Sequence, residues 1–344
     1  MTDDEVLFEK RGALGLITLN RPKALNALTH GMCLSMSAQL RDWSRDAGIN
    51  AVAIRGAGDR AFCAGGDIRA LYESGKAGTP YALDFYRDEY RLNAAIKHFP
   101  KPYVAFLRGI VMGGGVGVSV HGSHRIADET SVFAMPETGI GLFPDVGGSY
   151  FLPRCPGETG MYLALSGARL KTADMLHTGV ATHHVPAARI DDLIARLAHG
   201  EIPDAAIGAF AQDPGPASLA GQRAMIDRMF SGPSVEAVLA ALDMDRGEWA
   251  RDTATTIRTK SPTSLKVTHR QIREGRRLGF DDCMRMEFRM VNRIIAGHEF
   301  YEGVRAAIVE KDNAPKWLPA ALAEVSESDV DKYFAPLREK ELTL

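Results

Sequence analysis

Short runs of consecutive apolar residues recur in the first third of the chain. Three of them cover residues 14–19, 51–54 and 103–107, and turn-forming residues bound each run. Runs of this length are typical of strands that are buried on both faces. The sequence therefore predicts three buried strands.

Between the first two predicted strands, apolar residues recur at helical spacing. Met32, Met36, Leu40 and Trp43 follow this spacing after Thr29, a residue type that caps helix N-termini. The pattern predicts a helix here. Strands that alternate with helices indicate an α/β core.

Residues 81–99 show the same helical spacing and read as a long helix. Pro100 and Pro102 end it, because proline disfavours helix in the residue before it. Glu89 would then lie near the middle of this helix.

Strand signals fade from about residue 186 onward. The segments that suit helices are 188–198, 216–231, 234–251, 263–279 and 281–296. We therefore expect a core of residues 1–200 and a helical C-terminal region of residues 201–344 that packs on it.

Composition narrows the function classes. The 344 residues are 45% hydrophobic, enough for a sizeable core, and the net charge is −2. Nucleic-acid-binding proteins usually show a basic balance or stripe. No apolar run is long enough to span a bilayer. We expect neither a nucleic-acid partner nor a membrane partner.

The first five residues and the cysteines bear on the compartment. Residues 1–5 are acidic and lack both the apolar core of a secretion signal and the Arg-rich pattern of a transit peptide. The cysteines are far apart and form no CxxC pair, which favours reduced, mostly buried thiols: Cys33, Cys63, Cys155 and Cys283. These features predict a cytoplasmic protein.

Two glycine-rich turns follow apolar segments. Met112 to Gly117 comes after the third predicted strand, and Phe62 to Asp67 lies upstream. Glycine lets backbone N–H groups approach a carbonyl oxygen that gains negative charge. A helix that opens at Gly114 would add its positive dipole end. The alternative is that these glycines only pack a helix against a sheet.

Two carboxylates follow in glycine-rich loops. Glu137 lies in Met135–Gly139, and Asp145 lies in Leu142–Gly148. Carboxyl groups handle protons or water in general acid–base chemistry. Together with the glycine-rich turns, they indicate chemistry at an acyl group.

Other chemistries fit less well. Gly117 to His121 resembles a nucleophile elbow around Ser119, but His121 replaces the final glycine. His121 and His124, like His183 and His184, lack a carboxylate or thiol at metal-binding spacing. The glycine run fits neither a dinucleotide nor a triphosphate motif. We expect no metal site and no nucleotide site.

Four segments in a fixed order resemble the enoyl-CoA hydratase/isomerase (crotonase) superfamily. They are residues 20–28, 62–67, 113–115 and 135–137, and the resemblance runs from near Val6 to beyond Leu170. It implies an α/β fold, a crotonase-like spiral of β-β-α turns followed by a C-terminal helical region.

The resemblance also implies an acyl-CoA substrate. Family members polarise the thioester carbonyl with two backbone N–H groups, and the matching positions are Gly66 and Gly114. These two amides would form the oxyanion hole.

Other segments are implied to contact the coenzyme A part of the substrate. Ala64, Gly65 and Asp67 match a loop near the adenine and pantetheine, and Lys311 matches a lysine of the family's closing helix that contacts a CoA phosphate. Coenzyme A would thus be part of the substrate.

One departure narrows the activity. Hydratases of the superfamily use a glutamate at the position of Glu137 and a second two residues after the glycine triplet, where this chain has Gly117. Ordinary hydration needs both carboxyl groups, so the glycine disfavours it.

Longer stretches resemble the 3-hydroxyisobutyryl-CoA hydrolase branch of the superfamily: residues 85–93, 113–122, 133–138, 141–148, 151–154 and 312–317. This resemblance implies a thioesterase for short 3-hydroxyacyl-CoA esters. The expected reaction converts 3-hydroxyisobutyryl-CoA to 3-hydroxyisobutyrate and CoA in valine catabolism, without a metal or redox cofactor.

The resemblance implies a role for three acids. Glu137 attacks the thioester carbon or activates water as general base. Asp145 orients Glu137 or the water, or binds the substrate hydroxyl, and Glu89 is a second candidate for that hydroxyl. The structural alternatives are a turn-capping Glu137, a turn aspartate at Asp145 and a solvated helix carboxylate at Glu89.

Two other functions stay open. An enoyl-CoA hydratase or isomerase uses related acids, and a non-catalytic member of the superfamily would only bind acyl-CoA. The resemblance also allows a homo-oligomer, either a trimer or a dimer of trimers.

Overall fold

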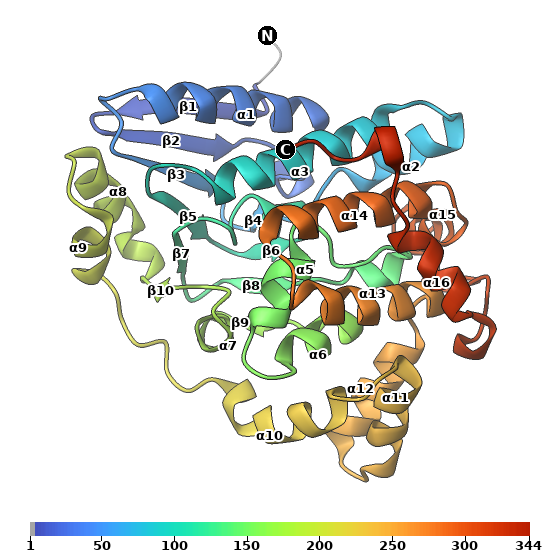
Figure 1. Cartoon of the computed structure of the whole chain (residues 1–344). Helices are drawn as coiled ribbons and strands as arrows, with labels where there is room; N and C mark the ends of the chain where they lie inside the picture. The colour runs from blue at the N-terminus through green and yellow to red at the C-terminus, as the bar shows by residue number, and fades with distance from the viewer. Residues whose placement is uncertain (1–3) are drawn as a thin grey trace. The chain divides into compact units, whose positions relative to one another are not determined.

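A six-stranded sheet contains the three strands predicted from the apolar runs. The computed structural model describes residues 4–344, so Met1, Thr2 and Asp3 of the acidic start lie outside the described residues. The strand order is β1-β2-β3-β5-β7-β10, in which β1 and β2 pair antiparallel and the other neighbours pair parallel (Figure 1). The strands are β1 (Val6–Arg11), β2 (Leu14–Leu19), β3 (Ala51–Gly56), β5 (Tyr103–Leu107), β7 (His124–Ala127) and β10 (His183–His184).

A second sheet has four short strands in the order β4-β6-β8-β9. Neighbours β4, β6 and β8 pair parallel, and β9 pairs antiparallel with β8. The strands are β4 (Ala61–Cys63), β6 (Ile110–Met112), β8 (Val132–Ala134) and β9 (Leu170–Lys171). The sequence did not predict them, because two or three residues are too few for a hydrophobic pattern.

From β3 to β8, successive strands alternate between the two sheets. The chain passes from β3 to β4, from β5 to β6 and from β7 to β8, and each passage adds one strand to each sheet. This alternation is the expected spiral of repeated turns. After His184, the described residues form helices and no further strand. The predicted fold class is confirmed.

The chain divides into two compact units, each built from separate stretches of sequence. Unit 1 comprises residues up to Gly66, 88–134 and 169–220, and unit 2 comprises residues 67–87, 135–168 and 221–344. Both sheets belong to unit 1. These units describe compactness and not independent folding. The predicted division into residues 1–200 and 201–344 therefore stays a prediction.

The helices vary in length from one turn to more than four. They are α1 (His30–Arg45), α2 (Ile68–Ala77), α3 (Tyr81–Lys97), α4 (Gly114–Gly117), α5 (Gly148–Phe151), α6 (Thr159–Ser166), α7 (Thr172–Thr178), α8 (Ile190–Ala198), α9 (Pro203–Gly208), α10 (Ser218–Phe230), α11 (Val235–Met244), α12 (Glu248–Arg258), α13 (Pro262–Gly275), α14 (Phe280–Ile295), α15 (Glu299–Val304) and α16 (Glu327–Phe334).

Local capping explains where α1 begins. Thr29 caps α1, since its hydroxyl oxygen accepts a hydrogen bond from the backbone N–H of Met32 at 3.2 Å. The single helix predicted over 234–251 is wrong: the chain breaks it into α11 and α12. Asp245 accepts from the N–H of Gly247 at 2.8 Å, which forms a turn between the two helices.

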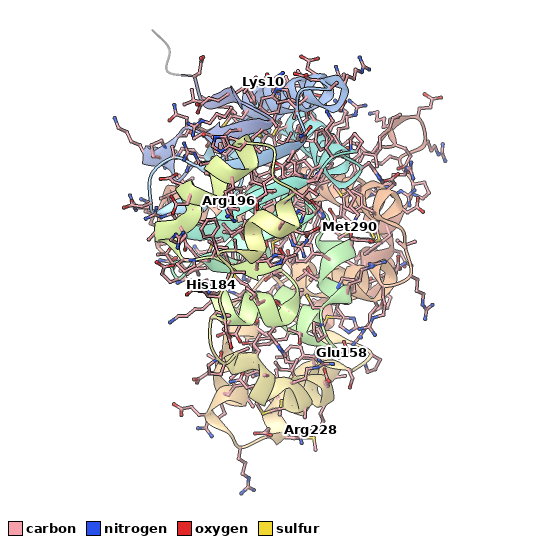
Figure 2. All side chains as sticks on the ribbon, turned by 90° about the vertical axis from the view of Figure 1, so that its left-hand side faces the viewer. Lys10, Glu158, His184, Arg196, Arg228 and Met290 are labelled. Carbon is pink, nitrogen blue, oxygen red and sulfur yellow. The ribbon has the colours of Figure 1, made fainter. Side chains whose placement is uncertain are left out.

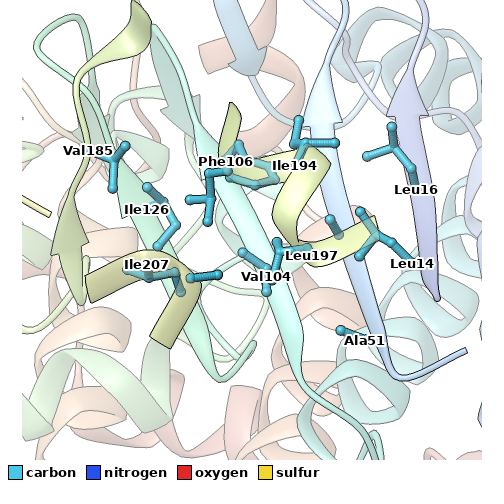
Figure 3. Close-up of a cluster of buried hydrophobic side chains, with 13 residues drawn as sticks. Leu14, Leu16, Ala51, Val104, Phe106, Ile126, Val185, Ile194, Leu197 and Ile207 are labelled. Carbon is cyan, nitrogen blue, oxygen red and sulfur yellow. The ribbon is translucent and has the colours of Figure 1, made fainter. Parts of the chain in front are cut away.

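One face of the six-stranded sheet packs against α8 and α9 in a buried apolar cluster (Figure 3). Burying each Leu or Ile side chain contributes about 1.5–3 kcal/mol. The cluster contains Leu14, Leu16, Ala51, Ala53, Val104, Phe106, Ile126, Val185, Leu193, Ile194, Leu197, Ala206 and Ile207. All of these residues belong to unit 1, so this unit has an apolar core of its own.

Some charged side chains form ion pairs at the surface. Lys10, which pairs with Asp46, is 48% exposed, and Arg228, which pairs with Asp245, is 69% exposed (Figure 2). Such exposed pairs contribute only about 0–1 kcal/mol each. No helix within residues 4–344 combines the length and the apolar composition needed to cross a bilayer.

Candidate active site

Three parallel strands of the small sheet lead into the motifs predicted to carry the chemistry. The segment from Ala64 to Asp67 follows β4, and the glycine triplet follows β6. The chain leaves β8 at Ala134 and reaches Glu137 through two residues. Ligand sites in open parallel sheets lie at the carboxyl ends of the strands. The topology therefore explains why the motifs recur in this order.

Gly66 and Gly114, here called the glycine pair, are neighbours in unit 1. A Cβ atom built on Gly114 would lie 3.3 Å from the amide nitrogen of Gly66. A Cβ atom built on Gly65 would lie 3.9 Å from the amide nitrogen of Gly114. The structure thus brings together the two amides that were predicted to form an oxyanion hole.

Close packing explains why the triplet must be glycine. A Cβ atom on Gly114 would lie 2.4 Å from Oε1 of Glu89, and one on Gly115 would lie 2.3 Å from the carbonyl oxygen of Cys63. The packing alternative therefore accounts for Gly115, which sits against β4. At Gly114 the neighbour is instead an acid.

The helix predicted to open at Gly114 is α4, which is a single turn. Few aligned peptides contribute to its dipole, so the individual N–H groups matter more than the helix. Ser119, considered as a nucleophile, is buried and donates its hydroxyl to the carbonyl oxygen of Gly115 at 2.7 Å. Its hydroxyl is thus engaged in local structure.

Glu89 lies on α3 and is only 2% exposed, which rules out a solvated helix carboxylate. Burial raises the pKa of the Cys63 thiol to about 12, and the Glu89 charge acts in the same direction. Burial and Glu89 likewise raise the pKa of Cys33. Glu89 is therefore a buried acid beside the glycine pair.

Histidines and cysteines have structural surroundings. His124 bonds Asp204 at 3.0 Å, His183 bonds Thr182 at 2.9 Å, and all four cysteines are buried free thiols. Within residues 4–344 no group of three or more His, Cys, Asp or Glu side chains is arranged to hold a metal ion.

Glu137 is a buried acid of unit 2, only 5% exposed, at the start of a short 3-10 turn (Glu137–Ile140). Its backbone carbonyl, and not its carboxylate, closes the turn by accepting from the N–H of Leu142 at 3.0 Å. Among the described residues, its Oε2 atom has no hydrogen-bond partner. Burial, and secondly the charge of Asp145, raises the pKa of Glu137 well above its ordinary value.

Asp145 lies in the loop before α5 and is 3% exposed. Its backbone carbonyl accepts from the N–H of Gly148 at 2.8 Å, as expected of a turn residue. Its carboxylate nevertheless lies near enough to Glu137 to shift the pKa of that group. The two acids that the sequence singled out in unit 2 are thus brought together.

The sequence reasoning missed another buried acid of unit 2, Glu287 on α14. It is 0% exposed and accepts hydrogen bonds from the N–H of Gly147 at 2.8 Å, the N–H of Ser149 at 2.9 Å and the Ser149 hydroxyl. Burial raises the pKa of Glu287 to about 8. The available signal was a glutamate on the apolar stripe of its helix, four residues from both Cys283 and Val291.

The residues expected near coenzyme A have defined local positions. Asp67 caps α2 by accepting from the N–H of Ala70 at 3.4 Å. Ala64 donates its N–H to the carbonyl oxygen of Leu25 at 3.0 Å. Lys311 is exposed and has a positive φ of 60°. Their contacts with coenzyme A remain a prediction.

The chain belongs to the enoyl-CoA hydratase/isomerase family, whose model matches residues 14–334. Two solved structures share its fold over almost the whole chain. A carnitinyl-CoA dehydratase from Mycobacterium thermoresistibile is 46% identical with a TM-score of 0.95, covering 99% of both chains. An enoyl-CoA hydratase from Rhodobacter sphaeroides is 40% identical with a TM-score of 0.94, covering 99% of this chain and 100% of that chain.

Curated relatives are similar over nearly their full length. The mitochondrial 3-hydroxyisobutyryl-CoA hydrolase of Danio rerio is 50% identical over 350 residues, which cover 99% of this chain and 92% of the relative. The human protein of the same name is 44% identical, with 98% and 90% covered. The predicted resemblance to this branch is confirmed.

The predicted cytoplasmic location is wrong by the same comparison, because these relatives are named as mitochondrial. The physical reason is that transit peptides are processing segments and not part of the fold. The acidic character of residues 1–5 therefore does not determine the compartment.

The buried carboxyl of Glu137 predicts that Glu137→Gln stabilises the fold. The folded state keeps the Glu137 proton to higher pH than the unfolded state does, so the free energy of unfolding falls as pH rises from about 4.5 toward the raised pKa. Glutamine has no proton to release over this range, so the free energy of unfolding of the variant does not fall in this way. Thermal unfolding at pH 8 should show a melting temperature higher by roughly 2 °C or more.

The matched control is Glu339→Gln, which neutralises an exposed glutamate. It should leave the melting temperature unchanged at both pH 5 and pH 8. A Glu137→Gln protein that gains no stability at pH 8 relative to pH 5 would show that the Glu137 carboxyl is not destabilised by burial.

Proposed function

We propose that this chain is an acyl-CoA thioesterase for short 3-hydroxyacyl-CoA esters. The substrate we assign is 3-hydroxyisobutyryl-CoA, which water cleaves to 3-hydroxyisobutyrate and CoA. The observation that carries the proposal is the buried Glu137 carboxyl, which has a raised pKa and lies near Asp145, while Gly117 occupies the place of the second hydratase glutamate. The similarity to proteins named as 3-hydroxyisobutyryl-CoA hydrolases supports the same assignment.

Two routes give the same products. In the first, Glu137 takes a proton from water while the water oxygen bonds to the thioester carbon, and the C–S bond then breaks. In the second, Glu137 attacks that carbon itself, CoA leaves, and water hydrolyses the resulting anhydride. A base with a pKa near the working pH is the most effective, so the raised pKa of Glu137 suits the first route.

The amides of Gly66 and Gly114 are assigned to the oxyanion. They are neighbours and obstructed by no Cβ of their own. Fixed N–H donors stabilise negative charge as it develops on the thioester oxygen, and one such donor is worth about 2.7–4 kcal/mol. This assignment serves either route.

Hydration of an enoyl-CoA is the second candidate, because two similar solved structures are named as a dehydratase and a hydratase. Hydration across a double bond needs two acids that share one water. Gly117 supplies none. We therefore rank hydrolysis first.

Other parts of the assignment remain predictions of the sequence. They are an acyl-CoA substrate contacted by Ala64, Gly65, Asp67 and Lys311, a reaction without a metal or redox cofactor, and assembly as a trimer or a dimer of trimers.

A thiol assay tests the proposed reaction directly. With 3-hydroxyisobutyryl-CoA, the protein should release one free thiol for each ester consumed, because hydrolysis breaks the C–S bond. With crotonyl-CoA, the absorbance of the enoyl thioester should persist. Loss of that absorbance without thiol, at turnover comparable to the hydrolysis, would replace the thioesterase with a hydratase, and binding without either reaction would indicate a non-catalytic member.

Glu137→Gln should abolish thiol release while acyl-CoA binding stays close to that of the wild type. Loss of one general base lowers kcat by roughly 10²–10⁴-fold. Steady-state kinetics and a binding titration with the substrate measure the two quantities separately. A folded variant with more than about half of the wild-type kcat would remove Glu137 from the mechanism.

Isobutyryl-CoA should be a poorer substrate than 3-hydroxyisobutyryl-CoA. The buried acid that recognises the hydroxyl loses this hydrogen bond, which costs about 1–3 kcal/mol, so kcat/KM should fall by roughly 10–10²-fold. Glu89→Gln and Asp145→Asn, measured with both esters, identify which acid is responsible. Equal kcat/KM for the two esters would show that neither acid recognises the hydroxyl.

A further inference from the structure

The loop that carries Asp145 is held from outside by two helices of the same unit. We call residues 144–149 the Asp145 loop. Both α13 and α14 contact α5, which begins inside this loop. The side chains that reach it, Gln271 and Glu287, belong to no motif that the sequence singled out.

Glu287 binds the loop after Asp145 through both carboxylate oxygens. Its Oε2 accepts from the N–H of Gly147 at 2.8 Å, and its Oε1 accepts from the N–H of Ser149 at 2.9 Å and from the Ser149 hydroxyl. The loop thus depends on one buried side chain for three hydrogen bonds.

Gln271 holds the loop on the other side of Asp145. Its Nε2 donates to the carbonyl oxygen of Pro144 at 2.6 Å, and its side chain is fully buried. A Cβ atom on Gly275 would lie 1.9 Å from the carbonyl oxygen of Ser149, so α13 packs tightly on the loop. Asp145 therefore lies between two anchored points.

The backbone of the loop needs such anchors. Val146 has φ +49° and Gly147 has φ +89°. A β-branched residue with positive φ is a rare, strained conformation that persists only where its surroundings impose it. The strained residue directly follows Asp145 and directly precedes the first N–H that Glu287 binds.

Asp145 lies near enough to Glu137 and to Glu287 to affect both acids. After burial, the nearby Asp145 contributes to the raised pKa of Glu287 and of Glu137. A small shift of the Asp145 loop would therefore change the field at Glu137.

We infer that Glu287 is a positioning residue, which fixes the Asp145 loop so that the Asp145 carboxylate keeps one orientation toward Glu137 and the substrate. This inference rests on the proposed function, because it assigns Glu287 to the same reaction. Glu287 itself touches no reacting atom. Its effect should pass through Asp145.

Glu287→Gln tests the inference with little change in volume. Glutamine keeps one acceptor oxygen, but its NH₂ group faces a backbone N–H and cannot accept from it. A misplaced catalytic group lowers the rate by roughly 10–10²-fold, so kcat should fall by this factor while KM changes little.

Asp174→Asn is the matched control. Asp174 is also a buried acid, on α7 of unit 1, and it accepts from the Ser218 hydroxyl at 2.6 Å and from the N–H of Leu219 at 2.8 Å. Its substitution removes similar hydrogen bonds in the unit that does not contain the Asp145 loop. It should keep a near-native kcat.

A double variant separates positioning from general destabilisation. If Glu287 acts through Asp145, then Glu287→Gln should lower kcat little further in an Asp145→Asn background. Multiplicative losses, or a folded Glu287→Gln protein with kcat within about twofold of the wild type, would overturn the inference.

Ser149→Ala covers the case in which Glu287→Gln does not fold. It removes only the hydroxyl donor and leaves both N–H bonds to Glu287. It should lower kcat several-fold, and only while Asp145 is present. A native kcat in this variant would overturn the inference.

Hydrogen exchange keeps this test separate from the proposed activity. The amides of residues 145–151 should exchange faster in Glu287→Gln, or in Ser149→Ala if that variant is the one that folds, and at the wild-type rate in Asp174→Asn. If the wild type releases no thiol, the proposed function fails while faster exchange still supports the anchoring. Unchanged exchange in this segment would overturn the anchoring even in an active enzyme.

Discussion

Parallel pairing of the short strands β4, β6 and β8 is the constraint on which the rest of the structure depends. Each strand has only three residues, so it forms only because its neighbours satisfy its backbone groups and because the alternating strands of the larger sheet hold its ends. The chain leaves β4 toward Gly66, β6 toward Gly114 and β8 toward Glu137. One repeated turn of backbone thus delivers two predicted oxyanion donors and one predicted catalytic acid.

Burial of acids gives unit 2 its chemical character. Glu137 and Glu287 are buried, and among the described residues neither forms an ion pair with a lysine, arginine or histidine. Removing a carboxylate from water without a cation favours its protonated form. The same desolvation that destabilises the fold brings the pKa of an acid toward the pH at which a general base works best. In this unit, the desolvation of the acids therefore lowers the stability of the fold and at the same time favours their reactivity.

The sequence predicted the elements and residues that belong to a hydrophobic pattern or a motif. It missed those that depend on contacts between residues far apart in the chain. Apolar runs identified β2, β3 and β5, and the glycine and acid motifs identified the glycine pair, Glu137 and Asp145. The strands of the small sheet are too short to leave a pattern. Glu287 lies roughly 140 positions after the loop it binds, so no local rule connects them. A polar residue on an apolar helix stripe is visible in the sequence, but its partner is defined only by the fold.

Glu89 is an acid close to the place where a hydratase would have its second glutamate. Gly117 offers no carboxylate, yet Oε1 of Glu89 lies 2.4 Å from where a Cβ of Gly114 would be, three residues earlier on α4. Residues three apart on a helical turn share a face. An acid is thus present beside the glycine pair, but it comes from α3 and not from position 117 of α4. In a hydratase, both acids must contact the same water molecule. Because Glu89 is fixed on α3 beside Gly114, the proposed function keeps it as a candidate for the substrate hydroxyl and does not count it as the second hydratase acid.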